Sequence, residues 1–386
     1  MTEPATAALK LLEYCEARDW GGYDPYDALN SPLAKVPLAN TRLGRIALIQ
    51  ALKRIPVNVR PLLLVPPTQN AKAVALFLSA ALRMPLLESR RQTLVRRLTD
   101  LLVRLRSPEA DYWCWGYSFP WQTRTILVPR GAPNLVCTTF VANALLDLHE
   151  RFDDQSCLEM AVSAATYLRD QLYWTDGDSA GFSYPLPSTR VHVHNANLLG
   201  AALLSRVARL SGENRFIEPA LRVARYSASR QRTDGAWVYG EAKTQGWIDN
   251  FHTGYNLCAL RDIGRHLHTK EFSEQIARGF EFYRAYFVRS DHVAPYYHDK
   301  IYPIDIHSVA QTIITLVTFR DVDSANLQRA HNVLEWAMRH MWDDRGFFYY
   351  RVLRCCTIRT AYMRWSQAWM LLAMSILLNG FEEVPG

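Results

Sequence analysis

Histidine and aspartate side chains recur in this 386-residue chain where apolar, helix-like segments begin, at steps of about 55 residues. If those helix starts face one cavity, residues distant in sequence would meet there. A histidine one turn inside an apolar helix needs a partner, because leaving it unpaired costs on the order of 1 to 3 kcal/mol. We therefore predict acid, base or charge-stabilising roles for Asp249, His252, Asp305 and His307.

Other polar and aromatic residues at the helix starts, and in the turns before them, would hold a substrate. Flat rings stack on pyranose faces, while amides and acids bond the hydroxyl groups of a sugar. Helix N-termini also favour negative charge, so the same pocket would suit a carboxylate or phosphate. The predicted binding residues are Asp24, Asp27, Tyr117, Trp121, Gln122, His194, Asn195, Asn197, Trp247, Asn250, Arg364, Trp365 and Gln367.

These residue types allow more than one chemistry. Two carboxylates across a cleft would serve glycoside hydrolysis, and the candidates are Asp24, Asp27, Glu241, Asp249 and Asp305. Proton abstraction beside a neutralised carboxylate would instead serve uronate elimination or epimerisation, and the candidates are His194, His252, His307, Tyr117 and Arg364. Helix capping is the purely structural alternative for the aspartates. The histidines lack the spacing of a metal site, and we expect no metal or cofactor.

The elements that would position these residues form an internal repeat. An aromatic, glycine-rich turn precedes each apolar helix, as in DGAWVYG from Asp234 and DDRGFFYY from Asp343, and should add a tight turn and a short strand. The helices that follow begin near Thr138, His194, Asp249, Asp305 and Met363. They are apolar on nearly every side, so we expect them to be buried together.

Amphipathic segments alternate with the buried helices, which predicts an inner ring wrapped by an outer ring. The segments from Asn70 and Leu86 supply a further inner and outer helix, and the N-terminal segment around residues 5–17 would close the ring. An extra helix from about Asn40 to Arg54 is left over, followed by a proline-rich connection. The predicted fold is all-α, an (α/α)6 toroid forming one domain over 1–386, in preference to an open helical solenoid.

The composition of the chain limits its expected partners and cellular location. A net charge of +7 is spread along the chain, so we expect no nucleic acid partner. Seven cysteines without a regular framework indicate reduced thiols, and the N-terminus lacks a signal-peptide pattern. With no uncharged apolar stretch long enough for a membrane span, we expect a cytoplasmic protein whose oligomeric state remains open.

Several motifs resemble those of a known family. They are GGYDPYDALNS (21–31), CWGYSFPWQTRT (114–125), HNANLLGAALL (194–204), QGWIDNFHTGYNL (245–257), YPIDIHSVAQTIITL (302–316) and YMRWSQAWMLLA (362–373). Together they are similar to VpsJ-like proteins of exopolysaccharide and capsule biosynthesis clusters, distant relatives of six-hairpin glycosidases and toroid uronyl lyases or epimerases. Pro120 departs from this pattern, where an acidic residue would be expected.

The resemblance implies a carbohydrate-active enzyme, a glycoside hydrolase or a uronyl lyase or epimerase, acting on a glycan or lipid-linked oligosaccharide. Other polysaccharide assembly proteins would be its partners. A non-catalytic glycan-binding or scaffold protein is the alternative. A terpenoid cyclase-like toroid is disfavoured, because neither a DxDD-type proton donor nor an Asp, Cys, His zinc set can be placed in the sequence.

Overall fold

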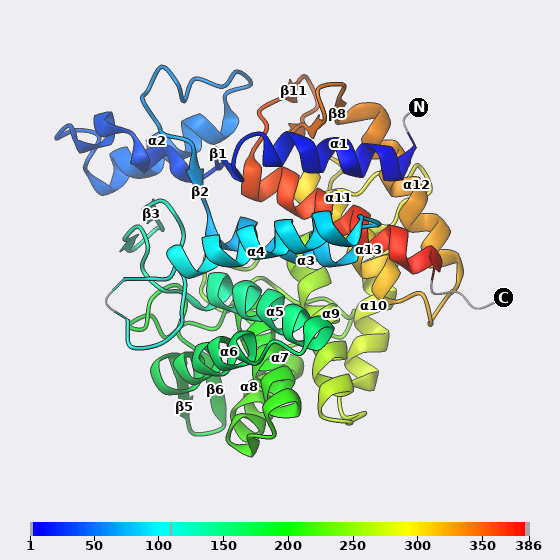
Figure 1. Cartoon of the computed structure of the whole chain (residues 1–386). Coiled ribbons are helices and arrows are strands. Elements are labelled where there is room, and N and C mark those ends of the chain that lie inside the picture. The colour runs from blue at the N-terminus through cyan, green and yellow to red at the C-terminus, as the bar shows by residue number, and fades with distance from the viewer. Residues whose placement is uncertain (1–2, 109, 383–386) are drawn as a thin grey trace.

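An inner ring of helices forms the centre of the computed structural model, which describes residues 3–108 and 110–382 (Figure 1). The inner helices within that range are α3 (Ala71–Arg83), α5 (Leu135–Phe152), α7 (His194–Ser211), α9 (Asn250–His266), α11 (Ile306–Thr318) and α13 (Trp369–Glu382). Each packs against the next, and α13 packs against α3, so the ring is closed. The predicted (α/α)6 toroid is confirmed.

Each inner helix has one outer partner. The outer helices are α1 (Pro4–Glu16), α4 (Glu88–Arg104), α6 (Gln155–Tyr167), α8 (Ile217–Ser229), α10 (Ser273–Phe287) and α12 (Ala325–His340). α1 packs against α13 and closes the outer ring from the N-terminus, as the sequence predicts. Outer helices such as α4 bury one apolar stripe and expose their charged faces, whereas α11 is buried almost throughout.

Side-chain caps fix where several inner helices begin. Asn134 accepts a hydrogen bond from the backbone N–H of Cys137, and Asp249 accepts one from that of His252. Asp305 caps α11 in the same way. Each cap satisfies an amide of the first turn that has no partner within its helix. The residues that follow each cap are therefore held at one end of the ring.

The strands are short and antiparallel, and they lie in the connections between helices. Their bounds are β1 (Gly21–Gly22), β2 (Thr68–Gln69), β3 (Trp121–Gln122), β4 (Leu127–Val128), β5 (Tyr173–Asp176), β6 (Ser179–Phe182), β7 (Ile304–Asp305), β8 (Trp342–Asp343), β9 (Phe347–Phe348), β10 (Arg351–Val352) and β11 (Thr357–Ile358). The aromatic turns from Asp176 and Asp343 contain the predicted strands. Those from Asp111, Asp234 and Asp291 make isolated bridges instead.

The leftover helix is α2 (Arg42–Arg54), and it stands apart from the ring (Figure 1). With the 3-10 turn η2 (Pro32–Lys35) and most of the 3-10 turn η1 (Asp27–Asn30), it belongs to residues 28–67, which we call the N-terminal lobe. The remaining irregular turns are the π-helical η3 (Leu168–Leu172) and η5 (Met363–Ala368) and the 3-10 turn η4 (Asn214–Phe216). No helix within the described ranges is long and apolar enough to cross a membrane.

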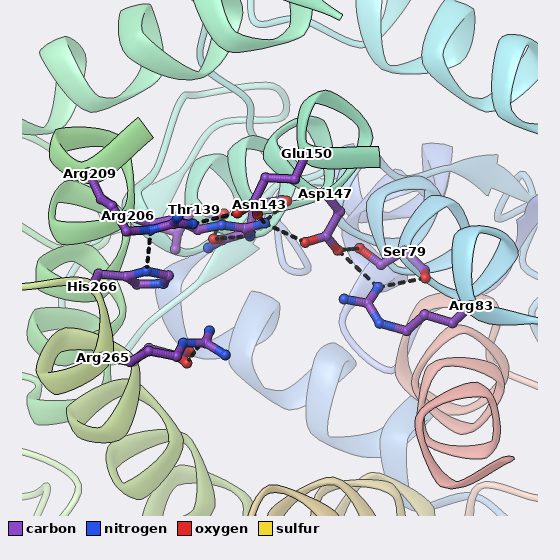
Figure 2. A network of polar contacts seen from close by, with 11 residues as sticks. Ser79, Arg83, Thr139, Asn143, Asp147, Glu150, Arg206, Arg209, Arg265 and His266 are labelled. Atoms are coloured by element: carbon purple, nitrogen blue, oxygen red, sulfur yellow. Dashed lines mark hydrogen bonds and ion pairs between the residues drawn. The ribbon is translucent and has the colours of Figure 1, made fainter. Parts of the chain in front are cut away.

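Ion pairs tie together the C-terminal ends of three neighbouring inner helices, and a hydrogen bond adds a fourth (Figure 2). Arg206 on α7 pairs with Asp147 and Glu150 on α5, and Asp147 also pairs with Arg83 on α3. Arg209 donates to His266 on α9 over 3.0 Å. A cavity of about 620 Å³ opens at this end of the ring. Arginines near helix C-termini are favourable because they face the negative end of the helix dipole.

Candidate active site

A second cavity, of about 390 Å³, lies at the N-terminal ends of the inner helices. Twelve of its twenty lining residues are aromatic. These are Tyr26, Tyr117, Phe119, Trp121, Tyr184, Tyr239, Trp247, Phe251, Tyr255, Tyr296, Tyr297 and Trp365. The rings of Phe140, Tyr255 and Trp369 lie in mutual contact at centroid distances of 5.3 to 6.0 Å. Since Tyr255 borders both cavities, this aromatic layer separates the two ends of the toroid.

One position of the repeat contributes to the cavity lining from all six inner helices. The second residue of each inner helix faces the cavity, if the turn η5 is counted as the start of α13. These six residues are Lys72, Val136, Asn195, Phe251, His307 and Arg364. Lys53 and Arg124 add two more cations, and no carboxylate lines the cavity among the described residues. The electrostatics therefore favour a substrate that is anionic or that gains negative charge during reaction.

His252 lies in the first turn of α9 and lines the cavity, and its Nδ1 is bound to a carboxylate. Its Nδ1 is 2.7 Å from Oδ2 of Asp249, and that same oxygen accepts a 2.9 Å hydrogen bond from Nε1 of Trp247. The Asp249 side chain is fully buried. A carboxylate on Nδ1 selects the tautomer whose Nε2 accepts a proton, so His252 is arranged as a general base or acid.

His307 occupies the first turn of α11 and is buried. Its Nε2 lies 2.6 Å from the hydroxyl of Tyr255, while its Nδ1 has no hydrogen-bond partner among the described residues. Burial lowers the pKa of His307 well below its ordinary value, and nearby Lys72 and Arg364 lower it further. The imidazole is therefore neutral and shares one proton with the Tyr255 hydroxyl.

Arg364 enters the cavity from the wide π-helical turn η5. Its Nε and Nη2 donate to the two carboxylate oxygens of Asp24 over 2.6 and 2.9 Å. The guanidinium lies 5.0 Å from the ring centroid of Tyr117 and 5.3 Å from that of Trp365. A bidentate carboxylate and two rings thus hold the cation in one place, where it lines the cavity.

Lys72, in the first turn of α3, carries a buried amine that forms no ion pair with any acidic residue in the described part of the chain. Its Nζ lies 4.1 Å from the ring centroid of Phe140 and 5.1 Å from that of Trp369. Burial lowers its pKa well below the ordinary lysine value, and the charge of Arg364 lowers it further. The two rings offset only part of this cost.

The predicted site residues fall into three groups. Those that line the cavity are Tyr117, Trp121, Asn195, Trp247, His252, His307, Arg364 and Trp365. Those directly behind these residues, bonded to them, are Asp24, Asp249 and Asp305. Those bonded elsewhere in the fold are Asp27, Gln122, His194, Asn197, Asn250 and Gln367.

Asp305 illustrates the supporting role. It caps α11 and accepts a 2.9 Å hydrogen bond from Nε1 of Trp365. Its other oxygen pairs with Arg351 over 2.9 Å. All of its lone pairs are directed at protein groups, so it can orient the cavity wall but has no oxygen free to react.

Several lining residues were not predicted, Lys72 and Tyr255 among them. A single lysine in the first turn of an almost wholly apolar helix is the sequence signal that identifies the first of these. The second lies one turn after Phe251 on the same helix face, so helical spacing would have found it. Tyr26 and Lys53 come from the irregular N-terminal segment, where no repeat indicates their position.

The fold has many relatives among solved structures, although no protein-family model and no curated protein matches the sequence. A cellobiose 2-epimerase from Bacillus thermoamylovorans is 10% identical, with a TM-score of 0.63 over 82% of this chain and 88% of its own. The Lin0763 protein from Listeria innocua is 10% identical, with a TM-score of 0.65 over 100% and 99% of the two chains. The shared feature is the fold.

A GH76 α-mannanase from Bacteroides thetaiotaomicron is similar too, at 11% identity and a TM-score of 0.63 over 82% of this chain and 88% of its own. Toroids named as an epimerase and as a mannanase are therefore about equally similar to this chain. At such identities the likeness establishes the (α/α)6 toroid and leaves the reaction to the residues of the cavity.

Proposed function

We propose that this protein is a carbohydrate epimerase or isomerase that moves a proton at the carbon beside the carbonyl of an open-chain sugar. One observation carries the proposal. Two histidines of opposite environment, His252 and His307, line a cavity that has basic side chains and, among the residues that the structure describes, no carboxylate. Both imidazoles lie against the ring of Phe251, at centroid distances of 4.1 and 4.5 Å. Such a pair can remove a proton and return it.

The roles follow from the bonds that each group already makes. His252, oriented by Asp249, takes the proton from carbon through Nε2. The Tyr255 hydroxyl, which is hydrogen-bonded to the neutral His307, donates a proton to the opposite face of the carbon, and the proton that His252 has taken then restores the Tyr255 hydroxyl. Arg364 stabilises the negative charge that develops on the oxygen of the enediolate. The proton count is unchanged over the cycle, and no group outside the chain and its substrate is required.

Hydrolysis is less well supported by this geometry. It needs one carboxylic acid and one carboxylate facing the scissile bond, roughly 5 to 10 Å apart. The buried aspartates Asp24, Asp249 and Asp305 instead accept bonds from Arg364, His252 and Trp365 and lie behind the lining. The aromatic walls fit sugar rings in either case.

The natural substrate is proposed to be a glycan of exopolysaccharide synthesis, on the strength of the motif resemblance. The similarity in fold to a cellobiose 2-epimerase makes reducing disaccharides suitable first substrates. Cellobiose and mannose would be tested alongside a uronic acid, because Lys53, Arg124 and Arg364 at the cavity would favour an acid.

Proton NMR in heavy water tests the reaction directly. A sugar epimerase or isomerase exchanges the hydrogen beside the carbonyl for deuterium, whereas a hydrolase leaves that hydrogen in place and releases a shorter sugar. We expect deuterium to enter at this carbon, and the variants H252Q and H307Q to lower the exchange rate by about 10² to 10⁴-fold.

A matched histidine serves as the control. His340 is exposed on the outer helix α12, where its ring stacks on Trp336, so H340Q should exchange at the wild-type rate. Circular dichroism would confirm that H252Q and H307Q are folded. Exchange at the wild-type rate in folded H252Q, or sugar release without deuterium uptake, would contradict the proposal.

A further inference from the structure

The N-terminal lobe exposes large aliphatic side chains. Of the sixteen large hydrophobic residues that are exposed within the described ranges, seven lie between residues 33 and 64. They are Leu33, Val36, Leu38, Leu43, Val57, Leu62 and Leu64. Exposed apolar residues are common singly, but such a concentration on one small lobe indicates a surface that binds something.

The same lobe is basic throughout. No aspartate or glutamate occurs between residues 28 and 87. The basic residues of the lobe are Lys35, Arg42, Arg45, Lys53, Arg54 and Arg60. Arg60 is buried against Asp27, while Lys35, Arg42 and Arg54 are exposed. The exposed leucines and valines are therefore interspersed with positive charges that no acidic residue of the lobe neutralises.

The exposure does not result from a lack of packing. The lobe has its own small core of Ala28, Ile49, Leu52 and Val65. Arg60 fixes it to the ring, because its guanidinium bonds the carboxylate of Asp27 over 2.7 Å and the hydroxyl of Tyr362 over 2.8 Å. The small core and the bonds of Arg60 therefore fix the backbone of the lobe while its apolar side chains remain exposed.

Leu64 supports the same conclusion through its backbone. It has a φ of +54°, in the left-handed region that a branched side chain such as leucine rarely adopts, and its side chain is 65% exposed. Hydrogen bonds from the N–H of Leu64 to Pro61 and from the N–H of Val65 to Arg60 hold this turn, so the backbone keeps the Leu64 side chain at the surface of the lobe.

We propose that the N-terminal lobe docks on an anionic lipid surface, with its leucines and valines entering the bilayer interface and its lysine and arginines meeting the headgroups. Basic residues interspersed with exposed aliphatic ones are the combination that such peripheral binding uses. A second copy of this chain fits less well, because two basic lobes would repel each other. Nucleic acid would match the charges but not the apolar side chains.

The lobe is next to the candidate active site. Tyr26, which comes just before the lobe, and Lys53 on α2 both line its cavity, and Nζ of Lys53 lies 2.6 Å from the Tyr26 hydroxyl. A docked lobe would hold the mouth of the cavity near the membrane surface. If the proposed function is right, this placement suits a sugar carried on a lipid, but lipid docking does not depend on that function.

Vesicle co-sedimentation of the full chain tests the docking. We expect it to sediment with phosphatidylcholine vesicles that contain phosphatidylglycerol, to remain in solution with pure phosphatidylcholine, and to be released by salt. The variant L38S/L62S/L64S should lose binding, and R42E/R54E should bind at least about tenfold more weakly. These five residues are exposed, so both variants should fold as the wild type does.

Matched substitutions outside the lobe control for general effects of polarity and charge. Leu87 and Val322 are exposed apolar residues elsewhere, and Arg96 is an exposed arginine on α4. L87S/V322S and R96E should bind the vesicles as the wild type does. Light scattering without lipid measures the oligomeric state. Failure to bind anionic vesicles, or a dimer that L38S/L62S/L64S converts to monomers, would overturn the proposal.

Discussion

Replacing Asp147 by asparagine would test how the ring is held at the end opposite the candidate active site. One carboxylate oxygen accepts hydrogen bonds from Ser79 Oγ and Arg83 Nη1, both over 2.9 Å, and the other accepts from Arg206 Nη2 over 2.7 Å. One side chain thus connects α3, α5 and α7 (Figure 2). D147N keeps the shape and removes the charge.

The expected loss follows from burial. Breaking a fully buried ion pair costs about 3 to 5 kcal/mol. The Asp147 and Arg206 side chains are 14% and 12% exposed, and Arg206 keeps Glu150 as a partner, so the loss should be smaller. Arg83 is 33% exposed and adds less than about 1 kcal/mol. We expect D147N to lower the free energy of unfolding by about 2 to 3 kcal/mol at neutral pH.

Urea unfolding followed by tryptophan fluorescence would measure this, and E150Q is the matched control. The Glu150 side chain is 37% exposed, so its loss should cost less than about 1 kcal/mol. Arg83 and Arg206 hold the pKa of Asp147 well below its ordinary value. A lowered folded-state pKa stabilises the protein above the ordinary carboxyl pKa, and this contribution is lost as the pH falls below about 4.

The difference between wild type and D147N should therefore shrink in acid. Two results would refute this reasoning: equal stability of D147N and wild type at neutral pH, or a difference that stays constant from neutral to acidic pH. Either would show that the carboxylate does not hold the three helices together through its charge.

Three further substitutions have predictable results. Burial lowers the pKa of Lys72 in the folded protein, so the lysine destabilises the fold at every pH where the unfolded chain is protonated. K72M should therefore raise the melting temperature at neutral pH, and the two melting temperatures should converge above about pH 10.5. D249N should slow deuterium exchange about 10²-fold or more with only a modest loss of melting temperature, since the amide still caps α9 but misorients His252. G254A should cost about 1 to 3 kcal/mol in urea unfolding, because a Cβ would lie 2.7 Å from Cγ of Gln311.

The fold could be predicted because helix burial leaves a clear mark on sequence. Helices that are apolar on all sides must lie inside, and amphipathic ones outside, so their strict alternation required two rings. The N-terminal lobe could not be predicted in the same way. Its helix α2 has only two buried residues, Ile49 and Leu52, and its position depends on the buried arginine at position 60, whose partners are distant in sequence.

The candidate site was only partly predicted, because the sequence locates a helix start better than it locates the direction of each side chain. Asn195 lines the cavity, whereas His194, one residue before it, and Asn197, two residues after it, contact Ser227 on the outer helix α8. A step of one residue turns a side chain by about 100° around the helix axis. All three residues were predicted to bind substrate, and the geometry separates them.

The register of the repeat removes much of that uncertainty, because each inner helix places its second residue at the cavity and its sixth one layer deeper. Adding four to the numbers of Val136, Phe251 and His307 gives Phe140, Tyr255 and Gln311, all of which border the cavity of about 620 Å³ at the C-terminal ends of the inner helices. The same rule gives Leu76 and Leu199. The last helix needs five residues, from Arg364 to Trp369, because its first turn is π-helical, with i to i+5 bonding. One residue per repeat therefore determines each layer. At the N-terminal ends of the helices those six residues include one histidine, two basic residues and no acid, so the second histidine of the proposed reaction, His252, comes from one position farther along α9.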